Sequence, residues 1–132
     1  TKFENYRICK TYIREKIMDP KFLILGFTYF TIAATAIWFQ THAQFFNEWS
    51  KDNALLVAIP GFIISYWSIK ATENIAEAYD GAVWPARLIG FGIGIILFSI
   101  LTWVILGEKI EIKSAVCVLL AFCILIIQLF WK

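Results

Sequence analysis

One long uncharged stretch constrains this chain more than any other feature. From Leu88 to Leu106, about nineteen consecutive residues carry no charge, close to the roughly twenty that an α-helix needs to cross the hydrocarbon core of a bilayer. We therefore predict that residues 82–106 form a membrane-spanning helix. Small residues recur every four positions in its first half, a spacing that lets another helix approach closely in lipid; they are Ala86, Gly90 and Gly94.

The composition favours a membrane protein for the chain as a whole. Its 132 residues are 60% hydrophobic and 17% aromatic, with a mean hydropathy of +0.69. A single soluble domain of this length has too small a core to hide so much apolar surface. The net charge of +2 is too small to indicate a nucleic-acid partner.

Three further segments are apolar enough to cross a bilayer, at about 22–46, 54–72 and 114–131. The second contains Pro60-Gly61, and proline removes a backbone hydrogen bond, so we expect a kink there. The expected fold is an all-α integral membrane protein with four transmembrane helices in an antiparallel bundle, occupying residues 20–132.

The first 19 residues differ from the rest because they are polar and highly charged. Apolar residues recur in them at helical spacing, at Phe3, Tyr6, Cys9, Ile13 and Ile17. We predict an amphipathic helix over 1–19 that lies in the membrane interface or docks on a partner's cytoplasmic surface. Most Lys and Arg residues fall on the side shared by this segment, the central loop and the C-terminus. The positive-inside rule then places both termini in the cytoplasm, in a cell or inner membrane.

Charged residues gather around the connection between the second and third spans. Glu73 and Glu77 share one helical face, as do Lys70 and Glu73. Such a group could bind a cation or carry a proton, but ordinary ion pairs at the membrane edge explain it as well, and we favour them. The residues are Lys70, Glu73, Glu77, Asp80 and Arg87.

A metal site is a weaker candidate. His42 is the one histidine, and Glu48 and Asp52 follow it in the connection after the first span. Imidazole and carboxylates can bind a metal, but this spacing matches no ligand signature, and an interfacial histidine is the favoured interpretation. The sequence offers no nucleophile–histidine–carboxylate set and no phosphate-binding loop. We expect no catalytic residue and no cofactor in this chain.

A resemblance to a known family covers part of the C-terminal half. The run WVILGEKIEIKSAVCVLLAFCILII, Trp103 to Ile127, resembles the end of the drug/metabolite transporter superfamily, where a Gly-Glu-Lys-aliphatic turn leads into the last helix. The four-span layout is similar to the small multidrug resistance branch, whose members are dimeric, proton-coupled exporters of cationic compounds. That branch uses a glutamate in its first span. Residues 22–46 contain none, so no site residue is carried over.

Two functions from different classes remain. We favour a non-catalytic accessory subunit of a larger membrane enzyme complex, such as a respiratory or membrane-bound monooxygenase complex, with the lipid bilayer and other membrane subunits as partners. The alternative is a small four-span transporter working as a homodimer. In that alternative, Glu73, Glu77 and Asp80 replace the first-span carboxylate.

Overall fold

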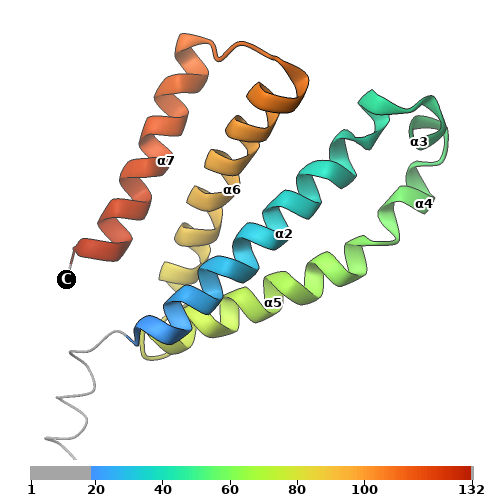
Figure 1. Cartoon of the computed structure of the whole chain (residues 1–132). Helices are drawn as coiled ribbons and strands as arrows, with labels where there is room; N and C mark the ends of the chain where they lie inside the picture. The colour runs from blue at the N-terminus through green and yellow to red at the C-terminus, as the bar shows by residue number, and fades with distance from the viewer. Residues whose placement is uncertain (1–18, 132) are drawn as a thin grey trace, which may run out of the picture.

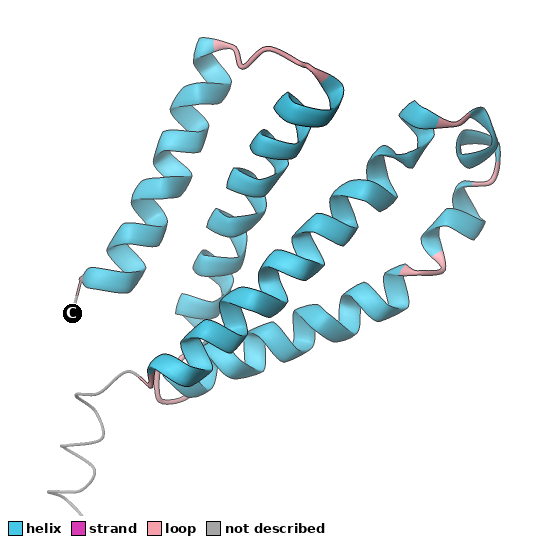
Figure 2. Cartoon of the chain, viewed as in Figure 1, coloured by secondary structure: helices cyan, strands magenta, loops and turns pink. Residues whose placement is uncertain are grey.

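The computed structural model describes residues 19–131, which fold into helices joined by short connections (Figures 1 and 2). Four stretches are long and apolar enough to cross a membrane, which confirms the prediction of an all-helical membrane protein with four such segments. The predicted amphipathic helix over 1–19 lies outside the described residues, except for Asp19. The helices are α2 (Pro20–Phe46), α3 (Glu48–Asp52), α4 (Ala54–Ala58), α5 (Gly61–Ala78), α6 (Val83–Leu106) and α7 (Ile112–Phe130).

Local sequence explains where the long helices begin and end. The Asp19 side chain accepts a hydrogen bond of 3.0 Å from the Lys21 backbone N–H, and proline follows at the first helical position. Helix α6 ends at Leu106 and is followed by Gly107, whose φ of 67° suits a residue without Cβ. Helix α5 ends in a Schellman turn, in which the Gly81 N–H bonds to the Ala76 carbonyl at 2.7 Å.

The second span is broken near its start, at the expected proline. Helix α4 ends at Ala58 and α5 begins at Gly61, because Pro60 has no N–H to donate. The carbonyls of Val57 and Ala58 accept hydrogen bonds from the Gln40 amide nitrogen of α2, at 2.9 and 3.1 Å. A side chain of the neighbouring helix thus supplies a donor to backbone acceptors at the break, as backbone within a membrane span requires.

The helix of this span continues beyond residue 72, where the membrane-crossing segment is expected to end, as far as Ala78. Charged residues in this stretch indicate a membrane edge, but they do not oppose a helix. Lys70 and Glu73 form an ion pair of 2.7 Å one turn apart, and the segment is rich in alanine, the strongest helix former. The helix therefore continues past the apolar part of the span.

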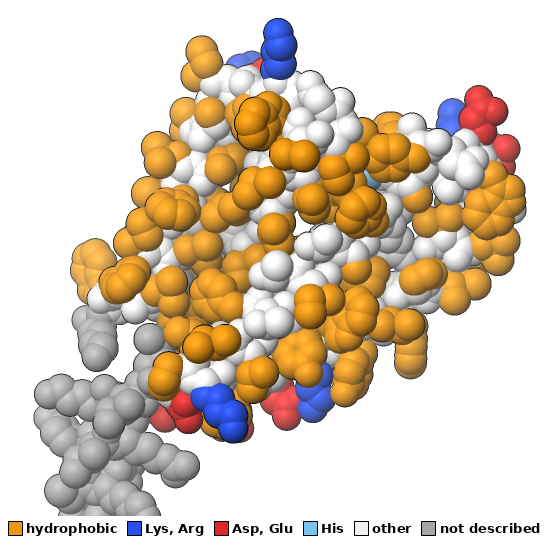
Figure 3. All heavy atoms as spheres, viewed as in Figure 1, with side chains coloured by type: hydrophobic (Ala, Val, Ile, Leu, Met, Phe, Trp, Pro, Cys, Tyr) orange, Lys and Arg blue, Asp and Glu red, His pale blue; other side chains and the backbone are white. Residues whose placement is uncertain are grey.

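The long helices form two pairs, α2 with α5 and α6 with α7, which converge at one end and separate toward the other (Figure 1). The core lies where they converge, and Ile75 of α5 and Ile89 of α6 are fully buried in it. Leu125 of α7 joins this cluster, and Phe30 of α2 packs against it. In Figure 3, charged side chains gather at opposite ends of the visible face and hydrophobic ones cover the region between, as expected for a bilayer-spanning body.

Two glycines allow the close helix approaches inside each pair. A Cβ on Gly26 of α2 would meet the Ile75 side chain and would lie 3.2 Å from the Ala71 carbonyl oxygen of α5. A Cβ on Gly92 of α6 would lie 2.7 Å from Leu125 Cγ of α7. Glycine is needed at both positions because any side chain would push the paired helices apart.

Candidate functional site: a cleft between α2, α5 and α6

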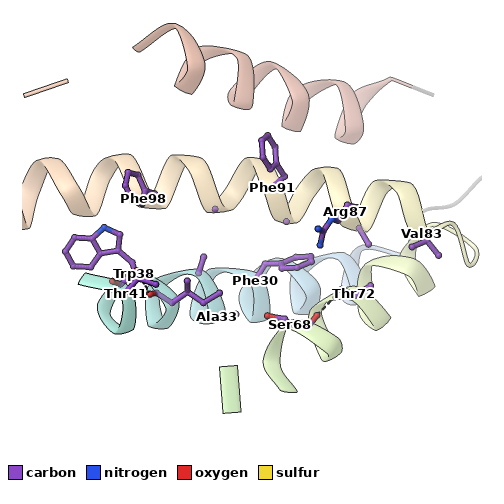
Figure 4. A pocket seen from close by; sticks show the side chains of 15 residues that line it. Phe30, Ala33, Trp38, Thr41, Ser68, Thr72, Val83, Arg87, Phe91 and Phe98 are labelled. Carbon is purple, nitrogen blue, oxygen red and sulfur yellow. Dashed lines mark hydrogen bonds between the residues drawn. The ribbon is translucent and has the colours of Figure 1, made fainter. Parts of the chain in front are cut away.

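The space between the two helix pairs contains a cleft of about 580 Å³ (Figure 4), within the range of about 300–1,000 Å³ typical of small-molecule pockets. Helices α2 and α6 form its long walls, and the later part of α5 contributes Ser68 and Thr72. Aromatic rings line much of it, at Phe30, Phe91 and Phe98. None of the described residues that line it is Asp, Glu or His.

One end of the cleft is closed by Trp38. Its side chain is 2% exposed, and its indole N–H donates a hydrogen bond of 3.0 Å to the hydroxyl of Thr102 on α6. The ring of His42 stacks on this indole with a centroid separation of 4.5 Å. The Nδ1 atom of His42 lies 2.8 Å from the Trp38 carbonyl oxygen, so the tautomer that donates from Nδ1 fits this contact.

Arg87 lies toward the other end of the cleft. In Figure 4 its side chain is on the same side as Ser68 and Thr72, away from Trp38 and Phe98. Among residues 19–131, Arg87 makes no ion pair, since the pair found there joins Lys70 to Glu73. It is the one charged side chain among the described lining residues.

The small residues of α6 have different surroundings. Ala86 is fully buried in the core. A Cβ on Gly90 would lie 2.8 Å from Cε1 of Phe30, so this glycine packs on an aromatic ring of α2. A Cβ on Gly94 would meet nothing within 4 Å, and this glycine lines the cleft.

The charged group around the α5–α6 connection is only partly brought together. Lys70 and Glu73 pair, whereas Glu77 and Asp80 are exposed and make no ion pair with described residues. Asp80 instead occupies the turn after α5 with a φ of 54°, a left-handed conformation that Asp tolerates better than most residues. Neither Glu77 nor Asp80 lines the cleft.

The metal candidates do not form a cluster. Glu48 and Asp52 are exposed at opposite ends of the short helix α3, while His42 stacks on Trp38. Within residues 19–131, no three His, Cys, Asp or Glu side chains gather as metal ligands would.

Sequence reasoning missed the contacts that shape the cleft. In the sequence, Trp38 looks like an ordinary interfacial aromatic residue and Thr102 is a single hydroxyl in an apolar helix. Nothing in the sequence therefore predicts a hydrogen bond between them. Gln40 gave a better signal, because an amide in an apolar span needs a partner and Pro60 leaves backbone carbonyls free. Gly26 and Gly92 do not belong to a four-residue repeat of small residues, which is the pattern that drew attention to Gly90 and Gly94.

Comparisons with protein-family models, curated proteins and solved structures find no match for this chain. The resemblance of its C-terminal half to drug/metabolite transporters therefore stays a prediction. What the chain does must be argued from its own geometry.

Proposed function

We propose that this chain is a non-catalytic accessory subunit of a larger membrane assembly. In this proposal its four spans run antiparallel, both termini are cytoplasmic, and residues 1–19 form an interfacial amphipathic helix. Its role is to pack against other membrane chains and stabilise them.

The observation that carries the proposal is the wide uncovered face of α7. This helix packs mainly on α6, and its buried residues are Ala121 and Leu125 alone. Large side chains on another face point away from the protein: Leu119, Phe122 and Ile126 are 62%, 53% and 43% exposed. Membrane helices associate through close van der Waals contact rather than hydrophobic burial. A span held along one narrow stripe leaves most of its circumference available for helices of other chains.

The cleft does not favour the alternative of a proton-coupled exporter of cations. Such a transporter needs a carboxylate where the cation binds. The described lining of the cleft has Arg87 as its one charge, and Glu73, Glu77 and Asp80 lie outside it. The geometry thus supports the subunit over the transporter.

The test is extraction from the native membrane in mild detergent, followed by a native gel and mass spectrometry. We expect the chain to migrate with larger chains. Migration alone at the size of a dimer would contradict the proposal and favour the four-span transporter.

A pair of variants tests the face on α7. Leu119→Ala with Phe122→Ala should reduce co-migration with the larger chains. Leu55→Ala with Phe62→Ala is the matched control, since these side chains are 84% and 85% exposed on another part of the surface. Equal co-migration of the two double variants would show that α7 is not the docking face.

A further inference from the structure

The cleft between α2, α5 and α6 is longer than the acyl chain of one bilayer leaflet. Its lining runs along one face of α6 from Val83 to Phe98, a distance of roughly 22 Å at about 1.5 Å per residue. One leaflet of a bilayer supplies about 15 Å of hydrocarbon, half of the roughly 30 Å core. An acyl chain of one leaflet is therefore shorter than the groove and fits along it.

The cleft is also narrow. Its volume of about 580 Å³, divided by a length of roughly 22 Å, gives a mean cross-section of about 26 Å², which for a round channel corresponds to a diameter of about 6 Å. An α-helix with its side chains is about 10–12 Å across. A helix of another protein would have to push α2 away from α6 to enter, against the hydrogen bond between Trp38 and Thr102. A single hydrocarbon chain needs no such movement.

The chemistry of the cleft changes along its length. Phe30, Phe91 and Phe98 offer apolar surface through most of it, while Arg87 places a guanidinium toward one end (Figure 4). Arg87 lies about one turn inside α6, which begins at Val83. At that depth its side chain can reach the headgroup region, the level at which a lipid carries its phosphate.

The positive charge of Arg87 decides which kind of ligand suits its end of the cleft. A guanidinium near the hydrocarbon region is costly without a counter-charge, and no described carboxylate pairs with Arg87. Its planar donors match a phosphate, which accepts two parallel hydrogen bonds. A cationic ligand would be repelled, and a neutral apolar one would leave the guanidinium without a counter-charge among residues 19–131.

We propose that this cleft binds one anionic phospholipid, with its phosphate on Arg87 and one acyl chain between the phenylalanines of α2 and α6. This site is independent of the accessory-subunit proposal, because it would exist in a free chain as well as in an assembly.

The test is native mass spectrometry of the full chain, in the form that mild detergent extracts, after exposure to vesicles of phosphatidylglycerol and phosphatidylcholine with identical acyl chains. We expect one phosphatidylglycerol to remain bound in preference to phosphatidylcholine. Arg87→Gln should lower phosphatidylglycerol binding about tenfold or more, as expected for loss of a charge-assisted bidentate contact. It should also reduce the preference, because the choline ammonium already offsets the phosphate charge of phosphatidylcholine and Arg87 then no longer favours the net-anionic lipid. Lys21→Gln removes the same charge from an exposed residue at the start of α2, outside the cleft, and should leave the preference unchanged.

A second variant separates loss of binding from loss of folding. Because nothing lies within 4 Å of a Cβ on Gly94, Gly94→Leu should fold normally while its side chain occupies the space of the acyl chain. We expect it to lose the bound lipid while its melting temperature is not lowered. Equal retention of both lipids, equal behaviour of Arg87→Gln and Lys21→Gln, or full lipid binding by Gly94→Leu would each overturn the proposal. So would release of a protein chain, instead of a lipid, by Arg87→Gln and Gly94→Leu.

Discussion

The indole N–H of Trp38 donates a hydrogen bond of 3.0 Å to the hydroxyl of Thr102. This buried bond joins α2 to α6 through two residues that lie 64 positions apart in the sequence. The two side chains bridge the second half of α2 and the last turns of α6. They therefore fix the width of the cleft at the end away from Arg87.

Removing the acceptor should destabilise the protein. In Thr102→Val the indole N–H stays buried without a partner, so the free energy of unfolding should fall by about 0.5–2 kcal/mol. Unfolding in mixed micelles of increasing denaturing-detergent fraction measures this. Thr102→Ser keeps the hydroxyl and should lose less. Thr35→Val is the control, since the Thr35 hydroxyl bonds only the Thr31 carbonyl of its own helix; equal losses at positions 35 and 102 would refute the structural role of the bridge.

Glycines on one helix should respond differently to the same substitution. Gly92→Ala places a methyl group 2.7 Å from Leu125 Cγ and 3.3 Å from the Ala121 carbonyl oxygen, so α7 must shift, at a cost of about 1–3 kcal/mol. Gly94→Ala meets open space and should be neutral or stabilise by up to about 1 kcal/mol through helix propensity. Thermal unfolding of the two variants in one detergent tests this, and a Gly92→Ala variant as stable as Gly94→Ala would contradict the packing of α6 on α7.

The amide of Gln40 should contribute to the stability of the fold, because it donates to two backbone carbonyls at the break between α4 and α5. Gln40→Leu leaves the Val57 and Ala58 carbonyls without the donor that now reaches them, and should lower stability by about 1–3 kcal/mol. Hydrogen exchange in α4 and the first turn of α5 should speed up with it. Gln44→Leu is the matched control, because Gln44 bonds only the nearby Thr41 carbonyl. Unchanged hydrogen exchange in Gln40→Leu would mean that water or lipid donates hydrogen bonds to the Val57 and Ala58 carbonyls as well as Gln40 does.

The sequence predicts the elements of this fold better than their arrangement. Uncharged length marks the four membrane-length segments, and Asp19-Pro20 and Pro60-Gly61 mark a helix start and a break, because each follows from local backbone chemistry. The helix of the second span continues to Ala78, past the end expected for the membrane-crossing segment near residue 72, since charge at residues 70–77 reports membrane depth and not the end of a helix. The cleft could not be predicted because it depends on how far α2 stands from α6. That distance depends on the hydrogen bond between Trp38 and Thr102. It also depends on two close helix contacts outside the cleft, because α5 packs on α2 at Gly26 and α7 packs on α6 at Gly92.

A tyrosine connects the end of α5 to the last turns of α7 and provides a test by pH. The hydroxyl of Tyr79, just after α5, donates a hydrogen bond of 2.7 Å to the Gln128 carbonyl oxygen in the last turns of α7. Tyr79→Phe removes it and should lower the free energy of unfolding by about 0.5–1.5 kcal/mol at neutral pH. Phe130→Leu, on an exposed side chain at the end of the same helix, is the control and should change stability little.

The contribution of the Tyr79 hydroxyl to the free energy of unfolding should decrease at alkaline pH. Burial raises the pKa of Tyr79 above its ordinary value of about 10, because the neutral phenol is favoured in the folded state. A group whose pKa is raised on folding contributes its stability fully below the unfolded pKa and loses it as the pH rises through the folded pKa. The stability difference between the native chain and Tyr79→Phe should therefore be constant from neutral pH to about pH 9 and shrink above about pH 10. A difference that stayed constant through alkaline pH would show that the phenol proton does not hold α7 to the end of α5.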